Sequence, residues 1–473
     1  MNPLVLPGEE YRDAYLRIVD LALDFLQSID QRSCFPQLTG EESVQRFTEP
    51  LPEQGMGPAA LDILDQVIDA SRPPSPRFFG YVLGSGEPIA AAADLLASVL
   101  NQNATAWRSG PAAACIEQLV TEWLARAIGC PAFVGILTGG GSSANLSALA
   151  MARESRIHAN ERGIRGPVAV YASEQIHMSI TKAIALLGIG RNQLRLIPCD
   201  HEFRIRTDLL RAAIAADRRA GTLPIAVVAS AGTVATGSID PLREMAAIAR
   251  ESEAWFHVDG AYGALAALAR PQLFDGMDLA DSISLDPHKW LYQPLDCGCL
   301  LYRNRSLARR TFSFTGDYAK ALQENPVESF AFFEQSVELS RRFRALKLWL
   351  SLRYHGMASF RQQIENDLEC AQHLAAVIGA RPDMEVMAPA PLSAVCFRYV
   401  PRQVSRDEAQ LDELNLRILT SVQKRGRVYV SNATIRGRFA LRACIVNHRT
   451  TPADVEAVVD EVVAVGRELS PGT

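Results

Sequence analysis

From about residue 78, short apolar runs alternate with longer stretches in which apolar residues recur at helical spacing. The short runs are rich in β-branched residues and end at glycine or polar residues, as strands do. Such alternation is typical of an α/β fold with a mostly parallel central sheet and helices on both faces. Strands are expected at 132–137, 168–171, 194–198, 225–230, 255–258, 281–285 and 298–302, and helices at 112–128, 145–161, 176–187, 209–220 and 242–252.

The N-terminal 77 residues have a different pattern. Amphipathic helices are expected at 10–30 and 58–70, with a connector rich in proline and glycine at 35–57. Two helices are too few to bury a core of their own. We therefore expect residues 1–77 to form a helical segment that packs at the interface with a partner subunit.

The alternation ends near residue 311. Residues 311–335 are polar and aromatic and predict a long mobile loop, and a helix is expected at 341–354. Beyond Gly356 the pattern predicts a helix, a strand and a helix, then strands at 428–431 and 438–445 and a last helix from Pro452. The predicted organisation is thus a large domain at 78–355 and a small C-terminal α/β domain at 356–473.

Composition narrows the class of protein. The 473 residues are 48% hydrophobic with a net charge of −5, which offers no basic surface for nucleic acid or an anionic membrane. Nine cysteines without a repeating spacing favour reduced thiols in a cytoplasmic protein, and the close pair Cys297 and Cys299 is interpreted as core rather than as half of a zinc site. The N-terminal residues do not resemble a signal peptide, and the apolar stretches 89–100 and 261–269 are too short to span a bilayer. A soluble, cytoplasmic protein is expected.

Two polar motifs follow neighbouring predicted strands. Lys289 lies in the motif Asp-Pro-His-Lys-Trp after one strand, and Asp259 ends the strand before it. Such a lysine can bind the aldehyde of pyridoxal 5′-phosphate (PLP) as a Schiff base, and such a carboxylate can keep the pyridine nitrogen protonated. The alternative is a surface lysine and a helix-capping aspartate. The pair favours a PLP site.

A glycine run provides a candidate phosphate site. Thr-Gly-Gly-Gly-Ser-Ser-Ala-Asn, residues 138–145, joins a predicted strand to a predicted helix. Unpaired N–H groups at a helix N-terminus bind anions, and Gly141 and Ser142 are the expected contacts. The run lacks the lysine of a nucleotide P-loop and the spacing of dinucleotide sites. The alternative is a flexible turn.

His177 follows a predicted strand at the same end of the sheet. A lone histidine is more often structural than functional, but this one falls beside the glycine run, Asp259 and Lys289. Its imidazole could stack on a planar cofactor, with Ala261 on the other face because only a small side chain fits against a ring. We therefore include both residues in the candidate site.

Taken together, these motifs resemble the group II PLP-dependent decarboxylases, the family of aromatic-L-amino-acid, glutamate and histidine decarboxylases. The resemblance runs from about residue 10 to 460. It includes Phe-Phe-Gly-Tyr at 78–81, the glycine run, Gln-Ile-His at 175–177, His-Val-Asp-Gly-Ala-Tyr at 257–262, Asp-Pro-His-Lys-Trp at 286–290, Leu-Ser-Arg-Arg-Phe-Arg-Ala-Leu-Lys-Leu-Trp at 339–349 and Leu-Arg at 441–442. It implies the type I fold of PLP-dependent transferases, like that of aspartate aminotransferase.

The resemblance also implies roles for single residues. Lys289 binds the aldehyde, Asp259 pairs with the ring nitrogen, and His177 stacks on the ring opposite Ala261. Around the phosphate it places Gly141, Ser142 and His288, and Ser340 from the neighbouring subunit. Thr233 and Asp286 are also expected to bind the cofactor. The active site is therefore expected at a homodimer interface. Substrate contacts are expected from Tyr81, Asn103 and Arg442, the last at the substrate carboxylate.

Tyr318, in the predicted mobile loop, matches the family tyrosine that returns a proton to Cα after CO2 leaves. Related enzymes with phenylalanine there let oxygen intervene and form aldehydes, because a benzyl group has no proton to deliver. Tyrosine favours simple decarboxylation. The alternative is an ordinary exposed loop aromatic.

The chain departs from the family at several positions. Asp286 stands where the animal aromatic enzymes have asparagine, and a carboxylate near a phosphate is unfavourable without donors. Val234 leaves Thr233 as the only hydroxyl of a threonine pair. Asn103 and Thr105 replace an apolar and an aromatic residue, which weakens an aromatic slot and leaves polar groups in need of partners.

The expected activity is decarboxylation of an L-amino acid to its amine, with an aromatic side chain slightly favoured over an aliphatic or polar one. An oxygen-dependent aldehyde synthase, an aminotransferase and a non-catalytic protein of the same fold stay open as alternatives. They differ in their products: H2O2 and ammonia, a keto acid, or none.

Overall fold

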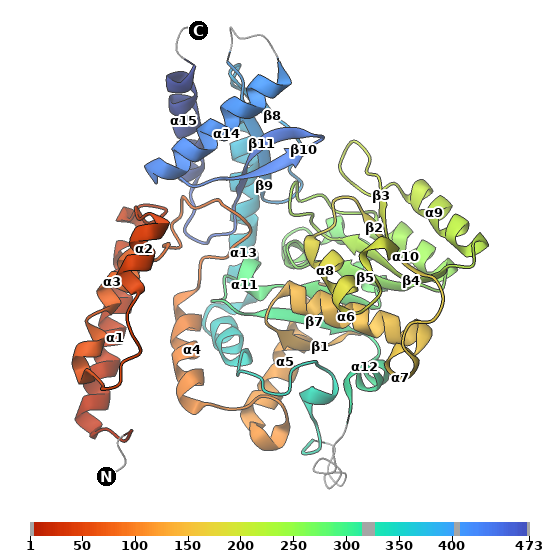
Figure 1. Cartoon of the computed structure of the whole chain (residues 1–473), viewed down its shortest axis with the longest axis horizontal. Coiled ribbons are helices and arrows are strands. Elements are labelled where there is room, and N and C mark those ends of the chain that lie inside the picture. Colours follow the sequence, from red (N-terminus) through yellow and green to blue (C-terminus); the bar gives the residue numbers. More distant parts are fainter. Residues whose placement is uncertain (1–3, 315–326, 402–406, 471–473) are drawn as a thin grey trace.

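The computed structural model describes residues 4–314, 327–401 and 407–470 (Figure 1). Its helices and strands build two sheets with helices packed around them, and the expected α/β class is confirmed. None of the helices in these ranges is long and apolar enough to cross a bilayer.

The larger sheet has seven strands in the order β1-β7-β6-β5-β4-β2-β3. All neighbours pair in parallel except β7, which is antiparallel to both β1 and β6. The strands are β1 (Val134–Thr138), β2 (Val168–Ser173), β3 (Leu194–Ile197), β4 (Leu223–Ser230), β5 (Trp255–Asp259), β6 (Ser282–Leu285) and β7 (Gly298–Tyr302). Each falls on a predicted apolar run.

Helices cover both faces of this sheet, because its strands are buried on both sides. In β4, Val227 and Ala229 belong to one hydrophobic core, and Ala226 and Val228 belong to the other. The first core is completed by α5 (Pro111–Ala127), α9 (Thr207–Arg219), α10 (Leu242–Glu251) and the start of α13 (Ala345–Gly379). The second is completed by α6 (Gly141–Ile157), α8 (Met178–Leu186) and α12 (Arg305–Phe312). Short α7 (Ala159–Arg162) and α11 (Pro287–Trp290) join elements at the two ends of the sheet.

The smaller sheet is antiparallel, in the order β10-β11-β9-β8. Its strands are β8 (Met384–Val386), β9 (Ala394–Tyr399), β10 (Ser431–Ile435) and β11 (Arg438–Cys444). It packs with α14 (Glu408–Arg425), α15 (Pro452–Leu469) and the second half of α13 around a core of its own. The strand expected at 428–431 begins later, with β10 at Ser431. Before it, Tyr429 makes an isolated parallel bridge to Phe78, and Val428 and Val430 are core residues.

The helix expected at 341–354 begins later than predicted. It starts at Ala345, because the residues just before it are fixed by side-chain ion pairs rather than by helical hydrogen bonds. Gly356, whose φ of 75° is left-handed, interrupts α13 at the expected boundary, and the helix expected beyond it continues to Gly379. Helix α12 ends at Phe312, within the loop expected at 311–335. Residues 315–326 of that loop lie outside the described ranges.

The N-terminal segment holds α1 (Gly8–Ser28), α2 (Gly40–Phe47) and α3 (Leu64–Ala70), and α4 (Pro88–Leu100) leads into the large sheet. The connector expected at 35–57 is not wholly irregular, because it contains α2. Thr39 and Glu42 form a capping box at the start of this helix. In Figure 1, α1 to α3 lie along one edge of the molecule, and only Leu21 of α1 is buried. The division into domains at residues 78 and 356 stays a prediction.

Candidate active site

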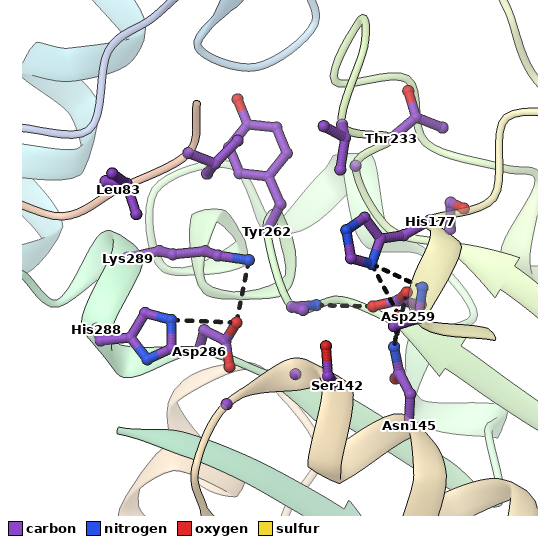
Figure 2. A pocket seen from close by; sticks show the side chains of 18 of the residues that line it. Leu83, Ser142, Asn145, His177, Thr233, Asp259, Tyr262, Asp286, His288 and Lys289 are labelled. Atoms are coloured by element: carbon purple, nitrogen blue, oxygen red, sulfur yellow. Dashed lines mark hydrogen bonds and ion pairs between the residues drawn. The ribbon is translucent and has the colours of Figure 1, made fainter. Parts of the chain in front are cut away.

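A cavity of about 300 Å³ lies at the carboxyl ends of β4, β5 and β6, where ligands of open α/β sheets bind. Elements from different parts of the chain meet there. Figure 2 shows Lys289, His177 and Asp259 pointing into the same space from three of these elements. The cavity brings together Gly141, Ser142, His177, Thr233, Asp259, Ala261, Asp286, His288 and Lys289.

Lys289 lies on the single turn α11 that follows β6. Its Nζ is 3.0 Å from Oδ2 of Asp286, and Nε2 of His288 is 3.4 Å from the same oxygen. The other ring nitrogen of His288, Nδ1, accepts from the N–H of Cys297 across 3.2 Å, which fixes the orientation of the ring. The lysine amine is therefore placed at the cavity by a carboxylate three residues before it.

Asp259 ends β5 and is surrounded by donors. Nδ2 of Asn145 donates to Oδ2 across 2.9 Å, while Oγ of Ser284 and the N–H of Ala261 donate to Oδ1 across 3.0 and 3.3 Å. Donors of this kind stabilise an ionised carboxylate. Asp259 thus offers a fixed negative charge to the cavity.

A chain of hydrogen bonds leads to Asp259 from the core. Nε1 of Trp255 donates to Oγ of Ser282, which contacts Nδ1 of His257 across 2.9 Å. Nε2 of His257 then contacts Oδ1 of Asn145 across 2.9 Å. Because an amide oxygen only accepts, His257 carries its proton on Nε2 and every bond in the chain donates toward Asp259. Burial lowers the pKa of His257 to about 4, so the ring is neutral.

His177 precedes α8 and caps it. Nδ1 of His177 accepts from the N–H of Ser179 across 3.3 Å and contacts its Oγ across 2.8 Å. Oγ of Ser179 in turn accepts from Asn145, so it donates to His177. Burial lowers the pKa of His177, although the charge of Asp259 opposes this. A neutral ring therefore faces the cavity with its Nε2 proton available.

The glycine run forms the floor of the cavity at the N-terminus of α6. Gly140 has a φ of 126°, which only glycine adopts without strain. A Cβ at Gly141 would lie 2.6 Å from Cβ of Ala261 and 3.1 Å from Oδ2 of Asp286. The first turn of α6 thus stays open to an anion, with Ser142 beside it (Figure 2). Thr233 also lines the cavity, with its hydroxyl 3.0 Å from that of Thr236.

These groups fit PLP. The cavity has an amine for an aldehyde, a carboxylate for a ring nitrogen, a neutral imidazole for a ring face and a helix N-terminus for a phosphate. Among the described residues no cluster of histidine, cysteine or acidic side chains suits a metal ion. The fold and the site together define a PLP-dependent enzyme of fold type I.

The family model for the pyridoxal-dependent decarboxylase conserved domain matches residues 59–400, and the chain belongs to this family. It is 34% identical to an aromatic-L-amino-acid decarboxylase of Bacillus atrophaeus over 99% of this chain and 98% of that one. It is 29% identical to a phenylacetaldehyde synthase of Petunia hybrida over 93% and 91% of the two chains. The crystal structure of Oryza sativa TDC with PLP and tryptamine superposes with a TM-score of 0.91 at 28% identity and covers 99% of each chain. The protein is accordingly a PLP-dependent amino acid decarboxylase.

Four of the expected site residues do not line this cavity. Tyr81 is 55% exposed and lies against Phe78 and Tyr429, and Ser340 is exposed. Oδ1 of Asn103 accepts from the N–H of Arg341 across 3.0 Å. Arg442 is buried on β11. Tyr318 lies outside the described residues.

Arg442 is the most unusual of these. Its Nη1 donates to Oγ of Ser431 across 3.2 Å, and that hydroxyl also accepts from the N–H of Tyr81. Its Nε and Nη2 have no partner within the described ranges, although both are buried. An unpaired buried guanidinium is costly and favours an anionic ligand.

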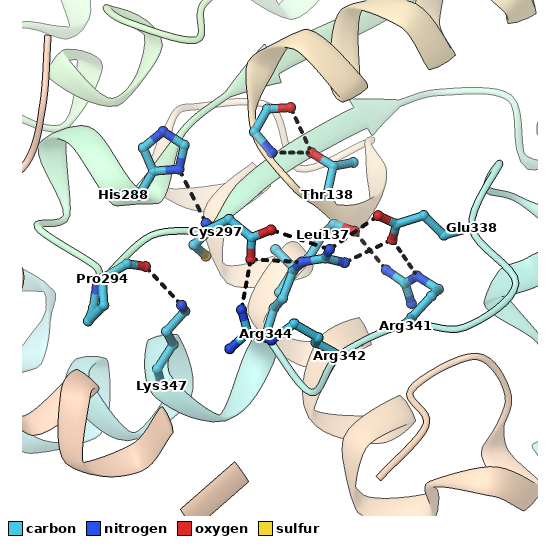
Figure 3. A network of polar contacts seen from close by, with 12 residues as sticks. Leu137, Thr138, His288, Pro294, Cys297, Glu338, Arg341, Arg342, Arg344 and Lys347 are labelled. Carbon is cyan, nitrogen blue, oxygen red and sulfur yellow. Dashed lines mark hydrogen bonds and ion pairs between the residues drawn. The ribbon is translucent and has the colours of Figure 1, made fainter. Parts of the chain in front are cut away.

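A network of ion pairs fixes the segment that presents Ser340 (Figure 3). Arg341 is fully buried, pairs with Glu117 across 2.5 Å and donates to the carbonyl of Leu137 across 2.7 Å. Arg344 pairs with Glu338 across 2.8 Å and with Asp296 across 3.2 Å. The network joins the segment before α13 to the strand that leads into the glycine run.

Sequence reasoning missed the residues that support Asp259 and His177. Asn145, Ser179 and Ser284 hold these side chains, yet they were not among the expected site residues. Asn145 could have been found, because it lies one helical turn after Gly141 and so faces the same side of α6.

Proposed function

We propose that this protein removes the α-carboxylate of an aromatic L-amino acid as CO2 and releases the amine. The observation that carries the proposal is the convergence of Lys289, Asp259 and His177 on one cavity beside an open helix N-terminus. The relatives support the substrate class: they include an aromatic-L-amino-acid decarboxylase, and the similar Oryza sativa structure contains tryptamine. The cavity also has apolar walls at Val82, Leu83 and Leu295.

The proposed roles follow from the geometry. Lys289 would hold the cofactor through its aldehyde, and the backbone at Gly141 and Ser142, with Thr233 and His288 nearby, would hold its phosphate. PLP supplies, when bound, a protonated ring that can take up the electrons of the bond broken at Cα. Asp259, whose carboxylate accepts from three donors, would keep that ring protonated. His177 and Ala261 would enclose the ring between them.

Arg442 is the proposed partner of the substrate carboxylate. Its guanidinium has two unpaired donors, and its charge acts on Tyr262, which lines the cavity. The backbone N–H of Tyr81 donates to Oγ of Ser431, which also accepts from Arg442. A carboxylate held by a fixed cation can be aimed for cleavage, which is an advantage of orientation rather than of affinity alone.

Tyr318 is the proposed proton donor to Cα after CO2 has left, since a phenol can deliver a proton to carbon there. The second candidate is oxygen-dependent aldehyde formation. It is favoured by the likeness to the phenylacetaldehyde synthase of Petunia hybrida. The tyrosine at 318 supports decarboxylation instead.

The active unit is proposed to be a homodimer in the cytoplasm. Helix α1 has one buried residue, while Leu16, Val19 and Leu23 are 37–49% exposed. Helix α4 likewise exposes Leu96 and Val99. A partner subunit would cover both surfaces. In such a dimer Ser340 and Asn103 would serve the partner's cavity, which accounts for their distance from the cavity of their own chain.

The test is CO2 release from purified, PLP-loaded protein. DOPA, tyrosine, tryptophan and phenylalanine are compared with glutamate, diaminobutyrate, histidine and valine, with Lys289→Ala as the inactive control. The proposal expects an aromatic substrate to give the highest kcat/KM and amine equal to CO2. A preference for glutamate or valine would contradict the substrate class. Stoichiometric H2O2 and ammonia would favour the aldehyde synthase.

A further inference from the structure

A carboxylate stands where the cofactor phosphate should bind. Asp286 is 3% exposed and lines the cavity. Its Oδ2 is close enough to Gly141 that a Cβ there would lie 3.1 Å away. In Figure 2 its carboxylate lies between Lys289 and Ser142, at the entrance to the first turn of α6. A phosphate held by that turn would therefore be a direct neighbour of Asp286.

The two carboxylate oxygens differ in their partners. Oδ2 pairs with Lys289 and lies 3.4 Å from His288. Oδ1 is buried and has no hydrogen-bond donor anywhere in the described part of the chain. Buried acceptors in folded proteins almost always receive a hydrogen bond, so Oδ1 of Asp286 needs a donor. The phosphate of PLP has no donor to offer unless a proton lies between the two groups.

The charges around Asp286 cannot neutralise both anions. Burial lowers the pKa of His288 and of His177, so both imidazoles favour the neutral form. Burial also raises the pKa of the Cys297 and Cys299 thiols, on which the charge of Asp286 acts. Asp259 adds a second carboxylate to the cavity. Within the described ranges, Lys289 and the partial charge of α6 oppose Asp286 and a phosphate that carries about −1.5 to −2 at neutral pH, and Arg344, near Gly139, is already paired with Glu338 and Asp296.

We propose that Asp286 and the phosphate of PLP share one proton, placed between Oδ1 and a phosphate oxygen, so that cofactor binding is coupled to protonation of this pair. Two acids in contact cannot both be ionised in a buried site, and one proton removes the repulsion and gives Oδ1 its donor. The proton comes from solvent, and no other bond is made or broken in the step. The inference rests on the proposed phosphate site and not on the substrate.

The test compares the wild-type protein with Asp286→Asn, which keeps the shape of the side chain and removes the acid. Calorimetric titration of the apoenzyme with PLP, in buffers of different ionisation enthalpy near pH 8, counts protons taken up. The wild type should take up about one proton more than the variant, whatever other groups titrate in both. As pH is raised, the Kd of the wild type for PLP should also increase by up to about tenfold more per pH unit than the Kd of the variant. Pyridoxal, which has no phosphate, should show no such difference.

Equal proton uptake by the two proteins would overturn the proposal. The wild-type protein alone offers a second measurement, should the variant fail to fold. Near pH 8 PLP binding should add either the infrared band of a protonated carboxyl group that the apoenzyme lacks or the phosphorus-31 resonance of a protonated phosphate, and the absence of both changes overturns the proposal. A holoenzyme with PLP bound but not fixed to Lys289 by borohydride would contradict the proposed function instead, so the two failures are distinguishable.

Discussion

Asn145 provides the sharpest test of how the site is supported. Its Nδ2 donates to Asp259 and to Ser179, and its Oδ1 accepts from His257, each across 2.9 Å. The substitution Asn145→Ala removes all three bonds. It takes one donor from Asp259, the carboxylate proposed to bind the cofactor ring, and leaves the proton of His257 without an acceptor.

The expected magnitude follows from the loss of a hydrogen bond to a charged group. Such a bond contributes about 1.5–3 kcal/mol, and about 1.4 kcal/mol corresponds to a factor of ten. If this stabilisation acts on the charge that keeps the cofactor ring protonated, kcat/KM falls by about 10- to 100-fold. The unpaired group on His257 also lowers the free energy of unfolding by about 1–3 kcal/mol.

Asn415→Ala is the matched control. Asn415 is also fully buried and also makes three bonds of 2.8–2.9 Å, to Tyr399 and Leu411 in the smaller sheet and α14. The two variants should lose similar stability in urea denaturation. Only Asn145→Ala should lose kcat/KM per folded molecule, measured as CO2 release. Equal kcat/KM in both variants would refute the role assigned to Asn145.

Three further outcomes are expected. Gly141→Ala places a Cβ 2.6 Å from Cβ of Ala261 and should raise the Kd for PLP at least about tenfold in a fluorescence titration. The control Gly379→Ala, whose Cβ would have nothing within 4 Å, should leave the Kd unchanged. Equal Kd values in the two variants would contradict the phosphate site. Arg442→Met should raise KM by about 10- to 100-fold through the lost charge-assisted bond, and an unchanged KM in steady-state kinetics would argue against contact with the substrate carboxylate. Burial lowers the pKa of His448 to about 4, so the unfolded chain binds a proton below about pH 6.5 that the folded protein excludes, and stability is lost as pH falls from about 6.5 to 4. In thermal denaturation His448→Gln should lose less stability than the wild type over this interval, and parallel curves would contradict the shift.

The large sheet was predictable because the apolar runs that form its strands end at glycine or polar residues. In β4 the apolar run is continuous, since both faces are buried, and it stops at the polar residue Ser230. In β5, which is also buried throughout, the strand ends at Asp259. Parallel strands end at one edge of a sheet, so the polar residues that follow them converge. The grouping of Lys289, Asp259 and His177 around one cavity was therefore within reach of the sequence.

Other features depend on contacts that the sequence does not display. The beginning of β10 is fixed by its hairpin with β11, and the preceding Val428 and Val430 are as apolar as strand residues. The capping box at Thr39 is visible in the sequence, but the surrounding prolines and glycines obscure it. The role proposed for Ser340 in a partner's cavity came from the resemblance and not from the residues around it, and its exposed position away from the cavity of its own chain supports that role.

The central claim is that Lys289 holds PLP covalently. Borohydride reduction of the PLP-loaded protein, followed by proteolysis and mass spectrometry of the peptides, tests it directly. The account predicts a pyridoxyl phosphate adduct on Lys289 and none in Lys289→Ala. An adduct on another lysine, or bound cofactor that borohydride fixes nowhere, would contradict it.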